Sequence, residues 1–135
     1  MKIKGRSISK GEAKGEVMIS KEPIGFYGAV NPETGEFIEE GHELEGKNIS
    51  GKILVFPKGK GSTVGSYVLY GLAKNNKAPK AIINKETETI VATGCILGEI
   101  PCVDKLEKDP LKNLSEGEKL KVNGDQGTIE KMNEE

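Results

Sequence analysis

One glycine-rich segment of this 135-residue chain carries the residues best suited to chemistry. Residues 58–66 read Lys-Gly-Lys-Gly-Ser-Thr-Val-Gly-Ser, with Ser62 at the tip. Glycines in such a turn let several backbone N–H groups point at one place, and that arrangement binds anions. A serine hydroxyl held there can be stabilised as an anion, so Ser62 is a candidate reagent rather than an ordinary surface serine.

The segments around this turn predict the elements that position it. The apolar run 53–56 predicts a buried strand, and the pattern of residues 66–75 predicts a helix. A buried strand at 81–84, a second helix within 86–99 and a strand at 101–103 are expected to follow. The middle of the chain therefore predicts a βαβ unit whose neighbouring strands are parallel.

Both ends of the chain predict β structure. Strands are expected at 2–6 and 15–20 with a polar loop between them, and residues 119–122 and 128–131 alternate as a hairpin does. Residues 21–50 are rich in turn signals but contain apolar and aromatic side chains, which predicts a long, ordered loop.

These elements together predict one α/β domain over residues 1–135, compact and barrel-like, with a frayed tail at 131–135.

Composition excludes several classes of function. Twenty basic and twenty-one acidic residues leave a net charge of −1, so a nucleic-acid partner is not expected. No apolar run reaches the roughly 20 residues that a membrane span needs, and the N-terminus lacks the apolar stretch of a signal peptide. We expect a soluble, cytoplasmic protein. Cys95 and Cys102 are too few to complete a metal site and are expected to be small buried side chains.

Residues 58–66 allow three other interpretations. A dinucleotide site is suggested by Gly59, Gly61 and Gly65, but the spacing is one residue too long; Glu86 or Glu88 would then bind the ribose. A phosphate-binding loop of nucleotide hydrolases would need Lys followed directly by Ser or Thr. A plain strand-to-helix turn would use Ser62 or Ser66 as the helix N-cap, and periodicity alone favours it.

Four segments of the chain resemble segments of a known protein family. Residues 25–35, 55–62, 78–83 and 99–104 resemble, in order, segments of the aconitase X family. Two shorter stretches at the front of the chain fit as well, 5–6 and 11–16. The resemblance covers nearly the whole chain, whose length is similar to that of the family's separate small subunit. It departs from the family pattern at Tyr27, Ala29 and Asn31, where many relatives have Trp, Gly and Asp.

This resemblance implies a fold and an activity. The fold is a swivelling β/β/α domain like the mobile domain of aconitase. Archaeal proteins of this kind are implied to dehydrate (R)-5-phosphomevalonate to trans-anhydromevalonate 5-phosphate, a step towards isoprenoids. The chain is implied to form a heterodimer with a large subunit that carries a [4Fe-4S] cluster, and to bind no metal itself.

The resemblance also implies that Ser62 is the catalytic base. Gly61 and Thr63 are expected to line the site with Ser66, although helix capping is the alternative role for Ser66. Lys60 is a candidate to attract phosphate, and solvated lysine is its alternative. Arg6, the only arginine, is a candidate clamp for the substrate carboxylate, with a surface pair to a nearby Glu as the equal alternative.

Two other functions stay open on the sequence. A swivelling phosphohistidine carrier would use His42, the only histidine, although an exposed loop histidine is the ordinary expectation. A dehydratase of another hydroxy acid, such as a hydroxyproline, is also compatible with the resemblance.

Overall fold

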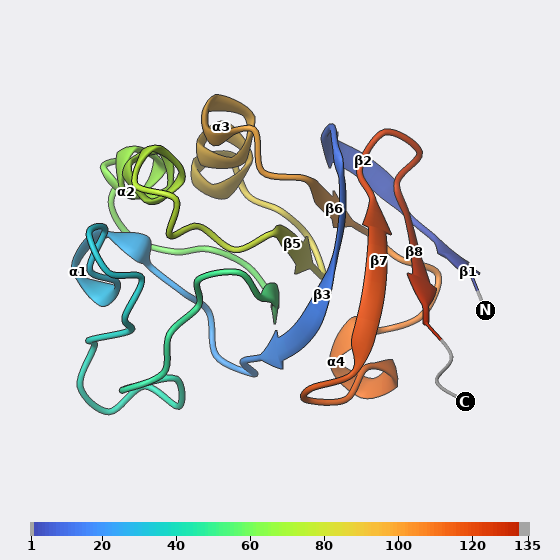
Figure 1. Ribbon diagram of the computed structural model, residues 1–135, viewed down its shortest axis with the longest axis horizontal. Coiled ribbons are helices and arrows are strands. Elements are labelled where there is room, and N and C mark those ends of the chain that lie inside the picture. Colours follow the sequence, from blue (N-terminus) through green and yellow to red (C-terminus); the bar gives the residue numbers. More distant parts are fainter. Residues whose placement is uncertain (1, 133–135) are drawn as a thin grey trace.

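The computed structural model describes residues 2–132 and contains a single eight-stranded sheet (Figure 1). The order across the sheet is β1-β8-β7-β3-β4-β5-β6-β2. The strands are β1 (Lys2–Lys4), β2 (Arg6–Ser9), β3 (Glu12–Ile19), β4 (Ile53–Phe56), β5 (Ala81–Asn84), β6 (Cys102–Asp104), β7 (Lys119–Asn123) and β8 (Thr128–Lys131).

The sheet curls into a barrel because its two outermost strands are consecutive in the chain. Only Gly5 separates β1 from β2, yet β1 pairs antiparallel with β8 and β2 pairs antiparallel with β6. The Gly5 N–H donates to the Gly127 carbonyl at 2.7 Å, which joins the two edges where they meet. Closure leaves no long unpaired edge.

Helices cover the parallel part of the barrel. Strands β3, β4, β5 and β6 run parallel, and α2 (Gly65–Lys74) and α3 (Thr89–Gly98) pack together over them, on the left of the barrel in Figure 1. Because side chains alternate along a strand, β4 contributes side chains to two hydrophobic cores. Ile53 and Val55 fill the barrel interior, whereas Leu54 and Phe56 lie under the helices.

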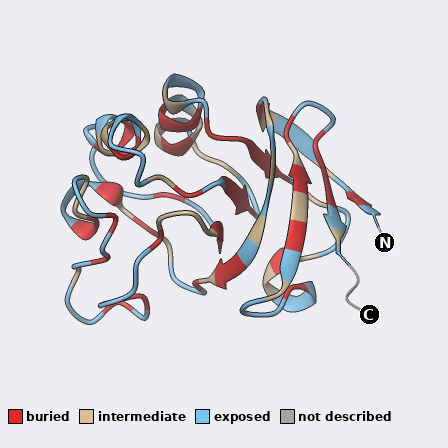
Figure 2. Ribbon diagram, in the orientation of Figure 1, coloured by how far each residue is buried: buried red, intermediate tan, exposed pale blue. Residues whose placement is uncertain are grey.

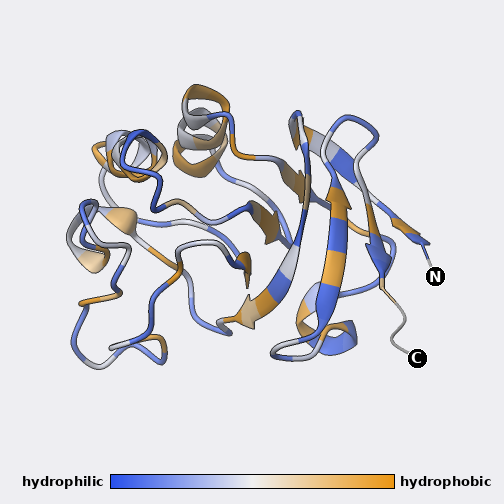
Figure 3. Cartoon of the chain, in the orientation of Figure 1, coloured by the Kyte–Doolittle hydropathy of each residue, from blue (hydrophilic) through white to orange (hydrophobic). Residues whose placement is uncertain are grey.

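The same alternation shows in the other strands. Buried and hydrophobic positions recur along β7, where Leu120 and Val122 face the barrel interior and the half-buried Lys121 separates them (Figures 2 and 3). A short helix, α4 (Pro110–Asn113), begins after Asp109, whose side chain accepts from the Leu111 N–H at 3.0 Å. It packs at one end of the barrel, close to β4.

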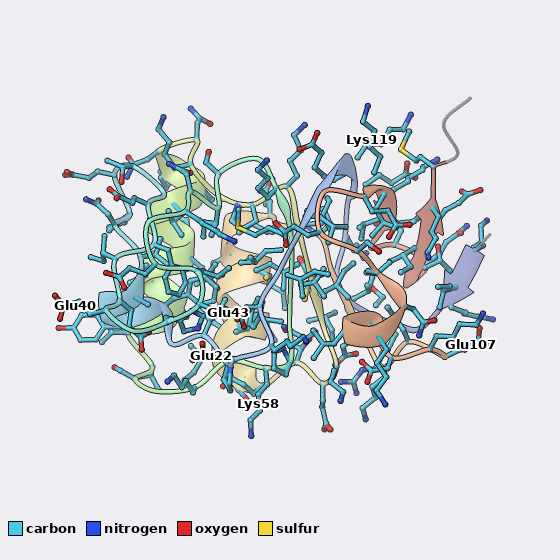
Figure 4. The ribbon with its side chains drawn as sticks, turned by 90° about the horizontal axis from the view of Figure 1, so that it is seen from below. Glu22, Glu40, Glu43, Lys58, Glu107 and Lys119 are labelled. Atoms are coloured by element: carbon cyan, nitrogen blue, oxygen red, sulfur yellow. The ribbon has the colours of Figure 1, made fainter. Side chains whose placement is uncertain are left out.

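Residues 21–50 form an ordered lobe, as predicted. It contains α1 (Phe26–Ala29), whose backbone leaves the helical region at Tyr27 and Gly28, and two isolated bridges. Phe26 and Phe37 are buried in the core under the helices. Glu22 and Glu43 lie beside each other in Figure 4, and the Glu43 N–H donates to the Glu22 carboxylate at 2.9 Å. Local hydrogen bonds and buried aromatic rings therefore hold a segment with little regular structure.

The predicted elements are confirmed in type for the middle of the chain, with boundaries that differ by one or two residues. The polar loop expected between the first two strands is wrong, because β2 and the front of β3 occupy it and only Lys10 and Gly11 turn the chain. Helix α4 was not predicted. The frayed tail is wrong at Lys131, which pairs with Leu120; residues 133–135 lie outside the described part.

No helix within residues 2–132 is long and apolar enough to cross a membrane.

Candidate active site

One edge of the sheet collects the carboxyl ends of the parallel strands. Phe56 is in register with Asn84, and Ile83 is in register with Val103, which places Asn84 beside Asp104. Ligands of sheets with parallel strands bind outside this kind of edge. The loop that carries Ser62 leaves β4 there.

Two of the sequence motifs meet at this edge. The loop after β4 runs alongside the segment after β3, where Ile24 forms an isolated bridge with Gly59. The Ile24 N–H donates to the Lys58 carbonyl at 3.2 Å, and the Lys60 N–H donates to the Ile24 carbonyl at 3.1 Å. The start of the 25–35 motif therefore holds the glycine-rich loop from one side.

Ser62 lies exposed at the start of the turn that leads into α2. Its hydroxyl accepts from the Val64 N–H at 3.1 Å, and its carbonyl accepts from the Gly65 N–H at 2.9 Å. Gly61, directly before it, has φ of +87°, a conformation that favours glycine. Sharp turning at Gly61 brings the Ser62 side chain to the tip of the loop.

The alternative of a helix N-cap holds for neither serine at the assigned start of α2, although the Ser62 hydroxyl accepts from the Val64 N–H one turn earlier. The N-cap of α2 is Val64, and no side chain caps the helix. Ser66 is 7% exposed, and its hydroxyl donates to the Thr63 carbonyl at 2.9 Å. Ser66 thus shapes the turn from inside the protein, whereas Thr63 is exposed beside Ser62.

Several backbone N–H groups in the turn around Ser62 are without an acceptor in the described part of the chain. Among residues 2–132, no acceptor takes the backbone N–H of Gly61, Ser62 or Thr63. The first turn of α2 contains no acidic residue, and the N-terminal end of a helix favours negative charge. Lys58 and Lys60 are exposed nearby, and Lys58 points away from the body of the molecule in Figure 4. The loop has the features that stabilise an anion.

Glu88 braces the loop from the other side. Its carboxylate accepts from the N–H groups of Ile90 at 3.1 Å and Val91 at 2.9 Å, and so caps α3. A Cβ at Gly59 would collide with the Glu88 carboxylate, so only glycine fits there without displacement. The use of Glu88 as a cap removes one of the two acids that a dinucleotide site could use and leaves only Glu86 as a candidate.

Arg6 lies on the same edge but is committed to an ion pair. It pairs across the strands with Asp104, and its Nε and Nη2 atoms donate to the two carboxylate oxygens at 2.9 and 2.8 Å. Asp104 is completely buried and also accepts from the Thr87 N–H at 2.7 Å. The hydrogen bond to Asp104 and its charge raise the pKa of Arg6. A surface pair with a Glu is therefore wrong, because a buried Asp is the partner, and Nη1 is the guanidinium nitrogen left over.

The two cysteines are buried side chains, as predicted. A hydrogen bond with Cys102 and burial raise the pKa of the Cys95 thiol well above its usual range. The Cys95 sulfur is thus kept as a thiol, and both cysteine side chains lie in a closed core rather than at an exposed ligand position. No group of three His, Cys, Asp or Glu side chains in the described chain could hold a metal ion.

His42 is not the exposed loop residue that the sequence predicts. It is 5% exposed and lies 4.5 Å from the Phe37 ring, centroid to centroid. Its Nδ1 atom accepts from the Leu44 N–H at 3.1 Å, so Nε2 carries the proton and donates to the Pro23 carbonyl at 3.1 Å. With both nitrogens engaged inside the lobe, His42 does not present a phosphate acceptor.

Three polar residues that the sequence reasoning passed over connect this edge. Asn84 is completely buried and donates to the Phe56 carbonyl at 2.9 Å, while Thr87 donates its hydroxyl to Asn84 at 3.1 Å and its N–H to Asp104. A signal was available, because Asn84 and Asp104 are polar residues directly at the ends of apolar strands. They tie the segment after β5 to the ends of β4 and β6, and the loop with Ser62 leaves the end of β4.

Asn31, one of the departures from the family pattern, has a structural role. Its side-chain oxygen accepts from the Glu33 N–H at 2.8 Å, and its carbonyl accepts from the Gly35 N–H at 2.8 Å. Either Asn or Asp can make this turn, because both side chains offer the oxygen.

The chain matches known proteins over nearly its whole described length. The model of the aconitase X swivel domain matches residues 2–131. The phosphomevalonate dehydratase small subunit of Methanosarcina acetivorans is 60% identical over 130 residues, 96% of this chain and 90% of that protein. The protein of the same name from Thermococcus kodakarensis is 55% identical, with 96% of both chains covered.

Solved structures agree. The crystal structure of Thermococcus kodakaraensis aconitase X in its holo-form has a chain with a TM-score of 0.93 and 53% identity, covering 98% of this chain and 99% of that one. A solution structure of a UPF0107 protein gives a TM-score of 0.88 at 47% identity, covering 98% and 100%. The chain therefore belongs to the aconitase X swivel domain family.

Proposed function

We propose that this chain is the small subunit of a phosphomevalonate dehydratase and that Ser62 is its catalytic base. The observation that carries the role of Ser62 is its place: an exposed hydroxyl among free backbone N–H groups, at the start of a helix and at the carboxyl edge of the sheet. The relatives' names support the reaction. As a hydro-lyase subunit, the chain supplies half of a site that a large subunit completes.

Dehydration of (R)-5-phosphomevalonate to trans-anhydromevalonate 5-phosphate removes one proton and one hydroxide. The Ser62 alkoxide takes the proton from the carbon beside the carboxylate, and the electrons of that C–H bond form the C=C bond as hydroxide leaves the next carbon. The proton on Ser62 and the hydroxide together account for the water released. That proton is weakly acidic, so the base must be a strong one.

The loop explains how a serine becomes a strong base. The Val64 N–H, which already donates to the Ser62 hydroxyl at 3.1 Å, and the N-terminal end of α2 stabilise the alkoxide more than the neutral hydroxyl. The free N–H groups of Gly61, Ser62 and Thr63 add to the positive potential of the loop. Each donor of this kind is worth about 10²–10³ in rate in other enzymes. Lys60 adds positive charge beside the loop and attracts the anionic substrate.

Arg6 is a second candidate for substrate binding. It lies in the same register row as Phe56, three strand spacings or about 14 Å across the sheet. Asp104 fixes its guanidinium, and the Nη1 group can donate to an anionic group of the substrate. Charge from Asp104 and Glu86 weakens that attraction, so we place Arg6 second to the Ser62 loop.

The residues of this chain do not fit an iron–sulfur cluster. A [4Fe-4S] cluster is held by Cys thiolates, whereas this chain has only two cysteines, both are buried, and the pKa of Cys95 is raised against the thiolate. We therefore place the cluster on the large subunit and assign it no step on this chain. The proposed complex works in the cytoplasm and takes a phosphorylated hydroxy acid, with no part for nucleic acid.

Co-expression of the chain with its large subunit tests the proposal. The complex should dehydrate (R)-5-phosphomevalonate, and Ser62→Ala should lower kcat by about 10²–10⁴, the usual contribution of a general base. Ser115→Ala is the matched control, since Ser115 is an exposed serine in the loop before β7 and lies outside the glycine-rich loop. Full turnover by an assembled Ser62→Ala complex would refute the base. Turnover of another hydroxy acid alone would refute the substrate.

A further inference from the structure

The aromatic residues of this chain divide into two groups. All three phenylalanines are buried, whereas all three tyrosines are exposed. Tyr27 and Tyr67 keep 62% and 68% of their surface free, the largest fractions among the exposed hydrophobic residues. Neither hydroxyl has a hydrogen-bond partner within residues 2–132. Aromatic rings in water with unused hydroxyls are typical of surfaces that bind another protein.

The two exposed rings arise from backbone segments that touch. A Cβ on Gly65, the first residue of α2, would lie 3.6 Å from the Tyr27 backbone nitrogen. Val64, which is 42% exposed, adjoins Gly65, and its carbonyl accepts from the Tyr67 N–H at 2.9 Å. We call Tyr27, Val64 and Tyr67 the apolar collar. It lies at the N-terminal end of α2, within a few residues of Ser62.

We propose that the apolar collar is the central contact of this chain with its large subunit, with Tyr27 and Tyr67 as the anchors. This rests on the proposed function. Ser62 is exposed, yet an alkoxide base needs a site from which water is excluded. The surface that covers Ser62 must therefore lie over the residues around it, and the collar is the apolar part of them.

The location of the apolar collar beside Ser62 favours the large subunit, rather than a second copy of this chain, as the protein that covers it. A second copy would bring another Ser62 loop with its lysines, and it would add no metal-binding group from the described residues. A standard interface buries about 800 Å² on each side, roughly an eighth of the 6861 Å² surface of this chain. The collar fills the centre of such an area, and the exposed Lys58 and Lys60 belong to its polar rim.

The test measures assembly rather than turnover. Purified large subunit is titrated with the wild-type chain, Tyr27→Ser, Tyr67→Ser and the double variant, and Kd is measured without substrate. Loss of an anchor residue typically costs enough to raise Kd about 30-fold. Tyr70→Ser is the matched control, because Tyr70 lies on the same helix one turn later and is 38% exposed, with Lys74 Nζ 5.9 Å from its ring centre.

A rise in Kd of this size for both anchor variants, with Tyr70→Ser unchanged, supports the apolar collar. An unchanged Kd for the double variant overturns it, and so does equal weakening by Tyr70→Ser. Analytical sedimentation of the chain alone tests whether a second copy binds the collar instead. Self-association that the anchor variants abolish would assign the apolar collar to contact between two copies of this chain. Urea unfolding confirms that each variant is folded. Tight assembly without dehydratase activity would refute the proposed function and leave the collar standing.

Discussion

Gly59 offers the sharpest test of how the loop is built, because it touches the residue that caps the next helix. A Cβ on Gly59 would collide with the Glu88 carboxylate and lie 2.6 Å from the Val91 side chain. In Gly59→Ala the carboxylate must leave the N–H groups of Ile90 and Val91, which costs about 1 kcal/mol for a lost cap. Crowding against Val91 adds about 2 kcal/mol.

One effect of Gly59→Ala raises the free energy of unfolding instead of lowering it. Alanine restricts the unfolded chain and so stabilises the fold by about 0.4–1 kcal/mol where the backbone accepts it, and Gly59 has no positive φ. The balance is a loss of about 2 kcal/mol in the free energy of unfolding, measured by urea titration of the isolated chain. Gly46→Ala is the control: its φ is +84° and nothing lies within 4 Å, so it reports backbone strain without a collision.

A double-mutant cycle separates the cap from the crowding. Glu88→Ala alone should cost about 1 kcal/mol, and Gly59→Ala should then cost about 1 kcal/mol less than it does in the wild type. The amide NMR signals of Ile90 and Val91 should shift in both single variants, because both lose the same acceptor. Additive losses, or a neutral Gly59→Ala, would refute the close approach of the loop to Glu88.

Three further predictions concern the buried polar groups. The hydrogen bond to Cys102 and burial raise the pKa of Cys95 in the folded chain, so the folded state holds this proton more tightly than the unfolded state does. The free energy of unfolding should therefore be constant below about pH 8.5, the pKa of a free cysteine. Above that pH it should fall by roughly 1.4 kcal/mol per pH unit until the folded pKa is reached. Urea titrations between pH 7 and 10 measure that slope; Cys95→Ala should flatten it, and an equal slope in both chains would contradict the assignment. His42→Ala should destabilise the chain by about 2–4 kcal/mol, since it leaves the Leu44 N–H and the Pro23 carbonyl without partners. His42→Asn, which keeps an acceptor for Leu44, should recover part of that loss, and hydrogen exchange at the Leu44 amide checks the local cause. Arg6→Ala should lower the urea midpoint more than Asp104→Ala does, because it leaves a buried carboxylate without its counter-ion, whereas the reverse change leaves a half-exposed cation. The opposite order would contradict this account of the pair.

Much of the architecture could be predicted from local patterns. The run at 53–56, the helix before Asn75 and the hairpin near residue 125 each carry their own periodicity and turn residues, and the structure confirms them. Strand β2 was missed because Arg6–Ser9 is short and polar. It exists because β6 offers it a partner and Asp104 a counter-ion, and neither is close to it in the sequence.

The site shows the same division. The sequence alone singles out Ser62, the glycines around it and, through the ordered motifs, the aconitase X family, because type and spacing carry that information. Only the tertiary structure decides the roles that depend on distant partners. It buries His42 and Ser66, uses Glu88 as a cap and joins Arg6 to Asp104. These outcomes depend on which side chains meet across the barrel and the lobe, and a single chain read in order does not contain those contacts.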